Sequence, residues 1–212
     1  MSIRDAVLAG VAKQLGHPSG FRGRLVGAAL NRGNRHLVGM ATQTLQLGEA
    51  SVVADVGFGG GVGLHLLLRA VGPSARVHGV EVSQTMLSQA ARRHRRDVAS
   101  GRLSLHSASM AELPFADGEL DGVITVNTIY FVADLDPAFA ELARVVNGTG
   151  RLVVGLADPE VMARLPFTEH GFRLRPVPEV ADALRSTGLS VEHQRISDHA
   201  DAPHLLIARA TA

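Results

Sequence analysis

After Gly48, apolar runs of strand length alternate with stretches of helical pattern, and this alternation constrains the fold more than any other feature. The runs that read as successive strands are Ser51–Val56, Arg76–Val82, Arg102–His106, Leu120–Val126 and Arg151–Leu156. Strands separated by helices predict βαβ units and a parallel sheet. Two further runs, Ser190–Ser197 and His204–Ala210, lie too close together for a crossover helix, which predicts an antiparallel last strand. We therefore expect an α/β fold.

Capping residues predict where two of the helices begin and end. Asp136 precedes Pro137, a combination typical of an N-cap followed by the first helical position. Asn147 with Gly148 then predicts the end of that helix. A second helix over Pro178–Thr187 is expected to end at Gly188.

The N-terminal part of the chain has a different pattern from the rest. A leading helix ends near Gly16, and a second helical region follows over residues 21–47. We interpret residues 1–47 as a helical N-terminal cap or lid and residues 48–212 as the domain that contains the sheet. A chain of 212 residues suits one compact domain overall.

Composition excludes several classes of function. The formal net charge of +1 disfavours a nucleic-acid partner, and the absence of cysteine excludes disulfides and thiolate metal ligands. The ten histidines have no ligand spacing such as H-x-x-x-H, so no metal site is expected. The N-terminus does not resemble a signal peptide, and no apolar run approaches the ~20 residues of a membrane span, which predicts a cytoplasmic protein.

A glycine-rich turn follows the first predicted strand. The segment reads D-x-G-x-G-x-G, from Asp55 through Gly57 and Gly59 to Gly61. Such a turn lets the backbone approach a ligand closely at the carboxyl end of a sheet. The dinucleotide pattern G-x-G-x-x-G does not fit, because its third glycine would fall on Val62 or on Leu64.

This motif resembles the first motif of the class I S-adenosylmethionine-dependent methyltransferases, in particular the small-molecule, type 11-like members. Glu81 ends the second strand, and the segment through Leu87 is similar to the family's acidic-x-Ser-x-x-Met-Leu segment. The resemblance implies a Rossmann-like, doubly wound seven-stranded sheet, mostly parallel, with S-adenosylmethionine as cofactor and S-adenosylhomocysteine as product. It also implies that Asp55, Gly57, Phe58, Gly59 and Gly61 in the loop contact the cofactor. The Glu81 carboxylate would bind the ribose hydroxyls, and Val82 and Met86 would pack against adenine and ribose. Ser83 would cap the following helix.

The resemblance continues through Ala111–Phe115, similar to the stretch before the family's fourth strand. Many relatives place an aspartate against the adenine amino group just before this stretch, whereas this chain has Ser109, followed by Met110. A hydroxyl without charge accepts that hydrogen bond more weakly than a carboxylate does. We expect both residues to contact the cofactor.

The fourth strand leads into the residues expected to carry catalysis, Asn127 and Tyr130. Their spacing is that of the Asn-Pro-Pro-Tyr motif of amino-group methyltransferases, although both prolines are absent. Asn127 is also expected to contact the cofactor. The alternative is that Asn127 caps the end of the strand and Tyr130 is an aromatic residue of the core. Methyl transfer is an in-line displacement for which alignment and exclusion of water supply much of the catalysis. If the acceptor needs a base, the candidates near the pocket are His17, His36, Tyr130, Asp134 and His170.

We therefore predict methyl transfer to nitrogen or oxygen of a small molecule. One alternative is a nucleic-acid or protein methyltransferase, whose substrate would contact the basic run Arg92–Arg96. A solvated helix face opposite Met86 and Ala90 explains this run as well. A second is a noncatalytic module that binds S-adenosylmethionine. A third is a quinone or phospholipid methyltransferase in transient contact with a membrane surface through the arginines of the N-terminal cap.

Overall fold

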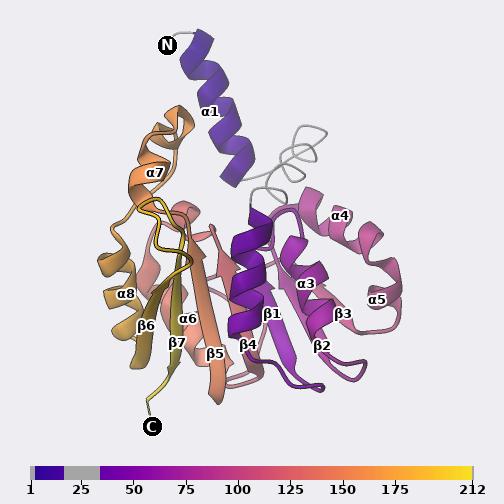
Figure 1. The fold of residues 1–212 in the computed structure, drawn as a ribbon. Coiled ribbons are helices and arrows are strands. Elements are labelled where there is room, and N and C mark those ends of the chain that lie inside the picture. The colour runs from indigo at the N-terminus through magenta and orange to yellow at the C-terminus, as the bar shows by residue number, and fades with distance from the viewer. Residues whose placement is uncertain (1–2, 17–33, 212) are drawn as a thin grey trace.

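The computed structural model describes residues 3–16 and 34–211, and the sheet that the alternation predicts forms its centre (Figure 1). The seven strands have the order β3-β2-β1-β4-β5-β7-β6. In chain order they are β1 (Val52–Val56), β2 (Arg76–Val80), β3 (Leu103–His106), β4 (Leu120–Val126), β5 (Val146–Leu156), β6 (Leu189–Arg195) and β7 (His204–Ala210). Each neighbouring pair is parallel except those of β7, which runs antiparallel to both β5 and β6. The predicted α/β class and the antiparallel last strand are confirmed.

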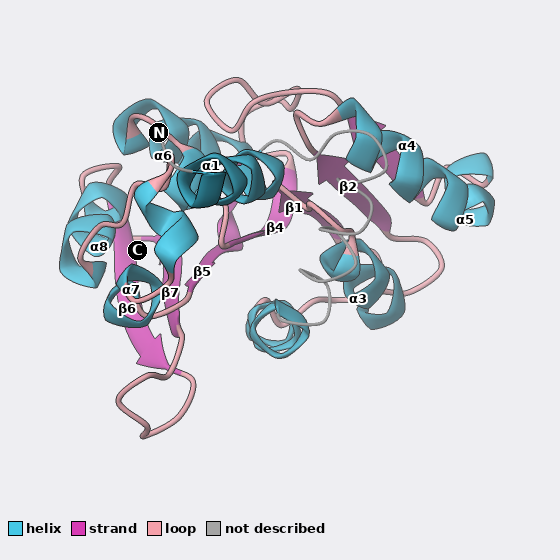
Figure 2. Ribbon diagram, turned by 90° about the horizontal axis from the view of Figure 1, so that it is seen from above, coloured by secondary structure: helices cyan, strands magenta, loops and turns pink. Residues whose placement is uncertain are grey.

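Helices cover both faces of the sheet (Figure 2). On one face, α3 (Val62–Ala70), α4 (Gln84–Arg93) and the helix over residues 34–44 enclose an apolar core. On the other face, α6 (Leu135–Val145) and α8 (Val177–Arg185) enclose a second core. Burial on both faces explains why the central strands read as continuous apolar runs instead of alternating ones.

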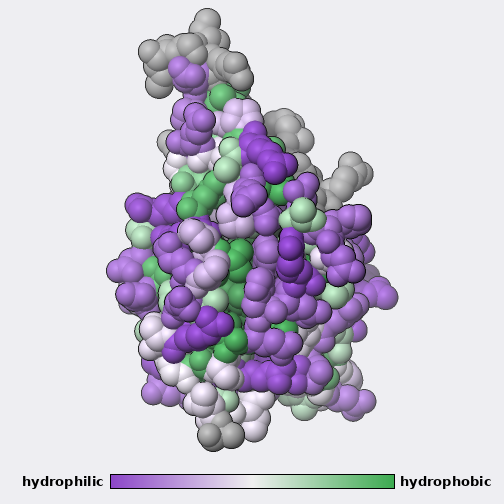
Figure 3. All heavy atoms as spheres, turned by 60° about the vertical axis from the view of Figure 1, so that its left-hand side comes forward, coloured by the Kyte–Doolittle hydropathy of each residue, from purple (hydrophilic) through white to green (hydrophobic). Residues whose placement is uncertain are grey.

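Shorter elements complete the chain. They are α1 (Ile3–Gly16), α5 (Arg95–Ala99), α7 (Pro159–Ala163) and the 3-10 helices η1 (Ile129–Phe131) and η2 (Pro166–Glu169). Helix α1 projects beyond the end of the sheet, where Val7 and Val11 on it are exposed (Figures 1 and 3). Hydrophilic residues cover most of the face that Figure 3 shows. No helix among the described residues is long and apolar enough to cross a membrane.

The start of α6 differs from the prediction. The N-cap is Asp134, whose carboxylate accepts from Asp136 N at 3.1 Å, and Asp136 and Pro137 lie inside the first turn. Proline is tolerated there because the N–H groups of the first turn have no partner within the helix. Asp134 takes the cap because its backbone is extended, with φ −127° and ψ 122°.

Other boundaries also differ. Strand β2 ends at Val80, before the predicted Val82, β5 begins at Val146, before the predicted Arg151, and β6 is Leu189–Arg195 where Ser190–Ser197 was predicted. Helix α6 ends at Val145, two residues before the predicted stop at Asn147, because Val146 is extended and pairs with Leu120 as the start of β5. The basic run does not lie on one helix: α4 ends at Arg93, and α5 begins at Arg95. The residue between them, His94, is buried, whereas the arginines beside it are exposed. The α8 helix ends at Arg185, two residues before the predicted Thr187, and the turn that follows contains Gly188 with its positive φ of 86°.

Candidate active site

A cavity of about 640 Å³ opens at the carboxyl ends of β1 and β4. From β1 the chain winds outward through β2 to β3 and then returns to β4 on the other side of β1. This reversal is the position at which open α/β sheets bind ligands. The cavity volume lies within the range of about 300–1,000 Å³ that small-molecule sites occupy.

The glycine-rich loop forms one wall of the cavity. Gly57, Gly59 and Gly61 have φ values of 75°, 49° and 79°, a left-handed conformation that other residues rarely adopt. A Cβ at Gly57 would overlap the side chain of Thr128, so this glycine is required for close packing between the loop and the end of β4. A Cβ at Gly59 would meet nothing within 4 Å and would enter the cavity. Gly59 therefore keeps open the space that a ligand needs.

Glu81 ties this loop to the end of β2. Its Oε1 accepts hydrogen bonds from Val82 N at 2.8 Å and Ser83 N at 3.0 Å, and its Oε2 accepts from Gly59 N at 2.9 Å. A carboxylate has about four acceptor positions, so three bonds leave about one for a ligand. Ser83 caps α4 as predicted, with its hydroxyl accepting from Met86 N.

Asp55 lies beneath the loop, and 4% of it is exposed. Burial, and in smaller part the negative charge of Glu81, raises the pKa of the Asp55 carboxyl to about 8. A Cβ at Gly63, in the first turn of α3, would overlap the Asp55 carboxylate, so the first helix can approach this acid only with glycine there. With this pKa, the acid at the head of the motif is mostly protonated at neutral pH.

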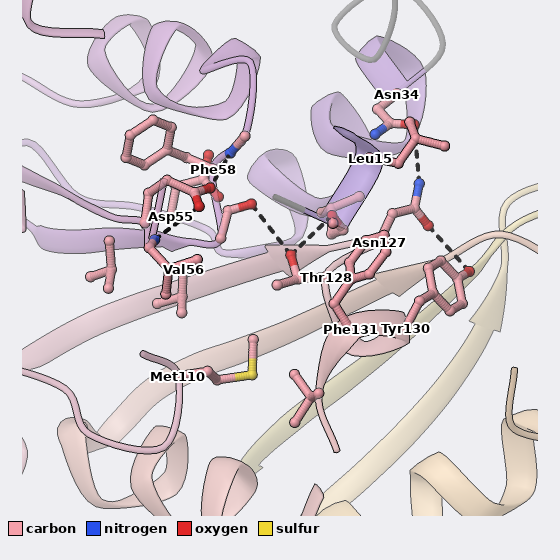
Figure 4. Close-up of a pocket in the computed structure, with 18 of the residues that line it drawn as sticks. Leu15, Asn34, Asp55, Val56, Phe58, Met110, Asn127, Thr128, Tyr130 and Phe131 are labelled. Atoms are coloured by element: carbon pink, nitrogen blue, oxygen red, sulfur yellow. Dashed lines mark hydrogen bonds between the residues drawn. The ribbon is translucent and has the colours of Figure 1, made fainter. Parts of the chain in front are cut away.

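Asn127 follows β4 in a strained conformation, with φ 56°. Its Oδ1 accepts from Ala157 N at 3.0 Å and from the Tyr130 hydroxyl at 3.3 Å, and its Nδ2 donates to Asn34 Oδ1 at 3.0 Å (Figure 4). Backbone strain of this kind costs about 1–3 kcal/mol and persists only where surrounding contacts impose it. The amide thus joins the end of β4, the end of β5 and the helix over residues 34–44 at the cavity wall.

Tyr130 is buried beside Asn127, and its hydroxyl also lies 3.1 Å from Ala157 O. Burial raises the pKa of Tyr130 well above its ordinary value, and the charge of Asp158 raises it further. A phenol of this kind is a poor base near neutral pH, so its contribution here is to orient Asn127 and the chain after β5.

Most of the residues predicted for the site line this one cavity. They are Asp55, Gly57, Phe58, Gly59, Glu81, Val82, Ser109, Met110, Asn127, Tyr130 and Asp134. Gly61 belongs to the turn but not to the wall, and Met86 lies in the core with 1% exposed. The Ser109 hydroxyl accepts from Ala111 N at 3.1 Å. Of the candidate bases, His36 and His170 are not part of the wall, and His17 lies outside the described residues.

The wall also contains residues that sequence reasoning missed. They come from α1, from η1, from α7 and from the segment around η2, and include Leu15, Gly16, Phe131, Met162, Leu165, Phe167 and Phe172. None of them belongs to a motif, and Leu15 and Phe172 are 157 positions apart in the chain. No local signal in the sequence marks them, since each alone reads as an ordinary apolar residue. In the described part of the chain, no group of three or more His, Asp or Glu residues is placed to hold a metal ion.

Comparison with known proteins agrees with this geometry. Residues 54–154 match the family model described as a methyltransferase domain. An uncharacterized 37.1 kDa protein in transposon TN4556 of Streptomyces fradiae is 35% identical over 58% of this chain and 36% of its own length. The O-methyltransferase rstn1 of Aspergillus nomiae is 28% identical over 66% of this chain and 64% of its own. The chain thus spans about one third to two thirds of the length of these relatives.

Among solved structures, the complex between the Haloferax volcanii Trm112 methyltransferase activator and the putative methyltransferase contains a similar chain. The TM-score is 0.76 at 20% identity, with all of both chains covered, which is a likeness of fold. The matched family model spans the same segment that supplies the glycine loop, Glu81 and the end of β4. Together with the sheet order and the position of the cavity, the matched methyltransferase domain supports a class I S-adenosylmethionine-dependent methyltransferase.

Proposed function

We propose that this chain transfers a methyl group from S-adenosylmethionine to nitrogen or oxygen of a small molecule. The observation that carries the proposal is the continuity of the cavity, which joins the glycine loop and Glu81 to a second, largely apolar region beyond the end of β4. One region suits a nucleoside cofactor, and the other offers space for an acceptor beside it. Methyl transfer needs both ligands in one enclosed space.

The residues present fit the cofactor. Open space at Gly59 admits the methionine part against backbone, and the remaining acceptor position on Glu81 suits ribose hydroxyls. Val82 is 43% exposed on the cavity wall, which leaves an apolar surface for the adenine. Ser109 and Met110 line the wall further along. When bound, S-adenosylmethionine supplies an activated methyl group on a positively charged sulfur.

The chain's own contribution to catalysis is positioning and exclusion of water. Asn127 is held by three side-chain hydrogen bonds and by its N–H to Gly155 O at 2.8 Å, so it presents a fixed polar edge between the two regions. Its second Nδ2 proton is available to orient an acceptor oxygen or nitrogen. Alignment of two bound reactants accounts for a large part of the rate enhancement of a bimolecular displacement.

We also propose that residues 1–47 act as a lid over the domain formed by residues 48–212. The support is that Leu15 and Gly16 of α1 and Asn34 and Val38 of the helix over residues 34–44 all contribute to the cavity wall. A lid of this kind would enclose the acceptor and keep water out.

Two measurements test the proposed function. S-adenosylhomocysteine should bind with micromolar or better affinity in calorimetry and raise the melting temperature, whereas NAD should do neither. With methyl-labelled S-adenosylmethionine and a small-molecule extract, the protein should produce labelled product. Binding without any product from any extract would leave a noncatalytic module, and equal stabilisation by NAD would contradict the cofactor assignment.

A further inference from the structure

We propose, on the basis of the proposed function, that the methyl acceptor is an uncharged molecule with a flat aromatic ring. It would bind among four side chains, Tyr130, Phe131, Phe167 and Phe172, which we call the aromatic cap. The cofactor region of the cavity is defined by its motifs. The aromatic cap is the part of the same cavity that those motifs leave unexplained.

The aromatic residues of this chain are concentrated at the cap. The sequence contains seven phenylalanines, one tyrosine and no tryptophan, so four of its eight such rings lie here. Phe172 is central: its ring centroid lies 4.7 Å from that of Phe131, 5.7 Å from that of Phe167 and 5.9 Å from that of Tyr130. The three phenylalanines are only half-buried, unlike the core residue Phe139. Rings that contact one another yet stay partly exposed provide a surface on which another ring can pack.

Three separate segments build the cap. Tyr130 and Phe131 come from η1 after β4, Phe167 from η2, and Phe172 from the loop that follows η2. Helix α1 closes the side: a Cβ at Gly16 would lie 2.7 Å from the Phe131 ring, so the helix end rests directly on that ring. Phe131 and Tyr130 appear together beside Asn127 in Figure 4, which places the apolar surface next to the polar edge where the nucleophile would lie.

The charge of the wall argues for an uncharged acceptor. Of the described residues that line the cavity, none is Lys, Arg or His. Two of its three acidic side chains, Asp55 and Glu81, belong to the cofactor region, and the third, Asp134, is exposed and caps α6. Against the described residues of this wall, an anionic acceptor would be buried without a cationic partner, which is costly. A cationic acceptor would be repelled by the positively charged sulfur of the cofactor.

A set of four probes on related bicyclic frameworks tests both parts of the proposal. They are 2-naphthol, the anion 6-hydroxy-2-naphthoate, the cation 6-(aminomethyl)-2-naphthol and the saturated decahydro-2-naphthol. Binding of each is measured by calorimetry with the full chain saturated with S-adenosylhomocysteine. We expect 2-naphthol to bind about tenfold or more tightly than either charged probe and about threefold to tenfold more tightly than the saturated alcohol.

Variants assign this preference to the cap. Phe172→Leu keeps an apolar side chain, and should remove most of the advantage of 2-naphthol over the saturated alcohol. Phe167→Leu, at the other end of the cap, serves the same purpose if the first variant does not fold. Val98→Ala removes an exposed apolar side chain on α5, outside the cavity wall, and should change nothing. Tighter binding of a charged probe, equal binding of the saturated alcohol, no binding of 2-naphthol at millimolar concentration, or a preference unchanged in both cap variants would each overturn the proposal.

A separate reaction distinguishes this proposal from the proposed function. The small-molecule extract is divided by ion exchange into neutral, anionic and cationic pools, and each is incubated with methyl-labelled S-adenosylmethionine. Product from the neutral pool is the expected result. Product from a charged pool alone would overturn the uncharged acceptor but keep the methyltransferase, whereas no product from any pool would refute the methyltransferase itself.

Discussion

Replacement of Glu81 by glutamine keeps the size of the side chain and removes its charge. The carboxylate accepts three backbone N–H bonds, two on Oε1 and one from Gly59 on Oε2. Glutamine has one acceptor oxygen, so in either orientation its NH₂ group faces at least one backbone donor. With the amide oxygen facing Val82 and Ser83, the bond to Gly59 is lost. Because a hydrogen bond to a charged group contributes about 1.5–3 kcal/mol, we expect the free energy of unfolding of Glu81→Gln to fall by about that amount.

The same change should weaken cofactor binding. Without its bond to Glu81, Gly59 is no longer fixed to the end of β2, and the acceptor position left for the ribose has lost its charge. We expect S-adenosylhomocysteine to bind about tenfold to a hundredfold more weakly, the equivalent of about 1.5–3 kcal/mol. Glu81→Ala, which loses all three N–H bonds, should be weaker in both respects. Turnover at saturating cofactor should change much less, because the ribose lies away from the transferred methyl.

Urea unfolding gives the stability and calorimetry with S-adenosylhomocysteine gives the affinity. Glu49→Gln is the matched control, since Glu49 is exposed in the turn before β1 and outside the cavity wall, and both quantities should stay at the parent value. A Glu81→Gln protein as stable as the parent would refute the expected contribution of the three N–H bonds to the free energy of unfolding. Lower stability with unchanged affinity would support the stabilising bond from Gly59 to Glu81 and refute the contact between Glu81 and the ribose.

Three further predictions concern the same end of the sheet. Gly57→Ala should lower the free energy of unfolding by about 2–4 kcal/mol, because the new Cβ would overlap Thr128 and the backbone φ is positive. Gly59→Ala should instead stay folded and lose cofactor affinity. Urea unfolding and calorimetry distinguish the two variants, and equal behaviour would contradict the assigned roles. The raised pKa of Asp55 lets the folded state hold a proton that the unfolded state releases above about pH 4, so the free energy of unfolding should fall as the pH rises from 4 towards 8, by at most about 1.4 kcal/mol per pH unit. Asp55→Asn should lose this slope when unfolding is measured at intervals across that range. An unchanged slope would refute the buried acid as its cause. Asp158→Ala removes the N-cap of α7 and the 3.1 Å contact of Asp158 Oδ2 with the buried His204, and should cost about 2–4 kcal/mol; faster proteolysis of the α7–η2 segment than in the parent is the readout.

The strands were predictable because their burial is uniform. A strand covered on both faces needs apolar side chains in succession, and β4 was predicted with its observed bounds, while β1 and β3 differ by one residue at the start. Helix boundaries were less predictable. Asp134 and Asp136 are both able to cap a helix, and only the extended backbone at Asp134 decides between them. In the same way, pairing of Val146 with Leu120 shortened α6 relative to the stop that Asn147 and Gly148 predict.

The glycine loop and Glu81 were determined by the sequence itself. Positive φ at Gly57 and Gly59 and an acid at the end of the next strand are local requirements, so residue type and spacing carry them without knowledge of the rest of the chain. The aromatic cap was decided only by the tertiary structure, as was the strained Asn127 that bonds Asn34 across 93 positions. Phe131, Phe167 and Phe172 come together because η1 and the segment around η2 meet over the end of the sheet, and an isolated phenylalanine in the sequence gives no indication of which others it will contact.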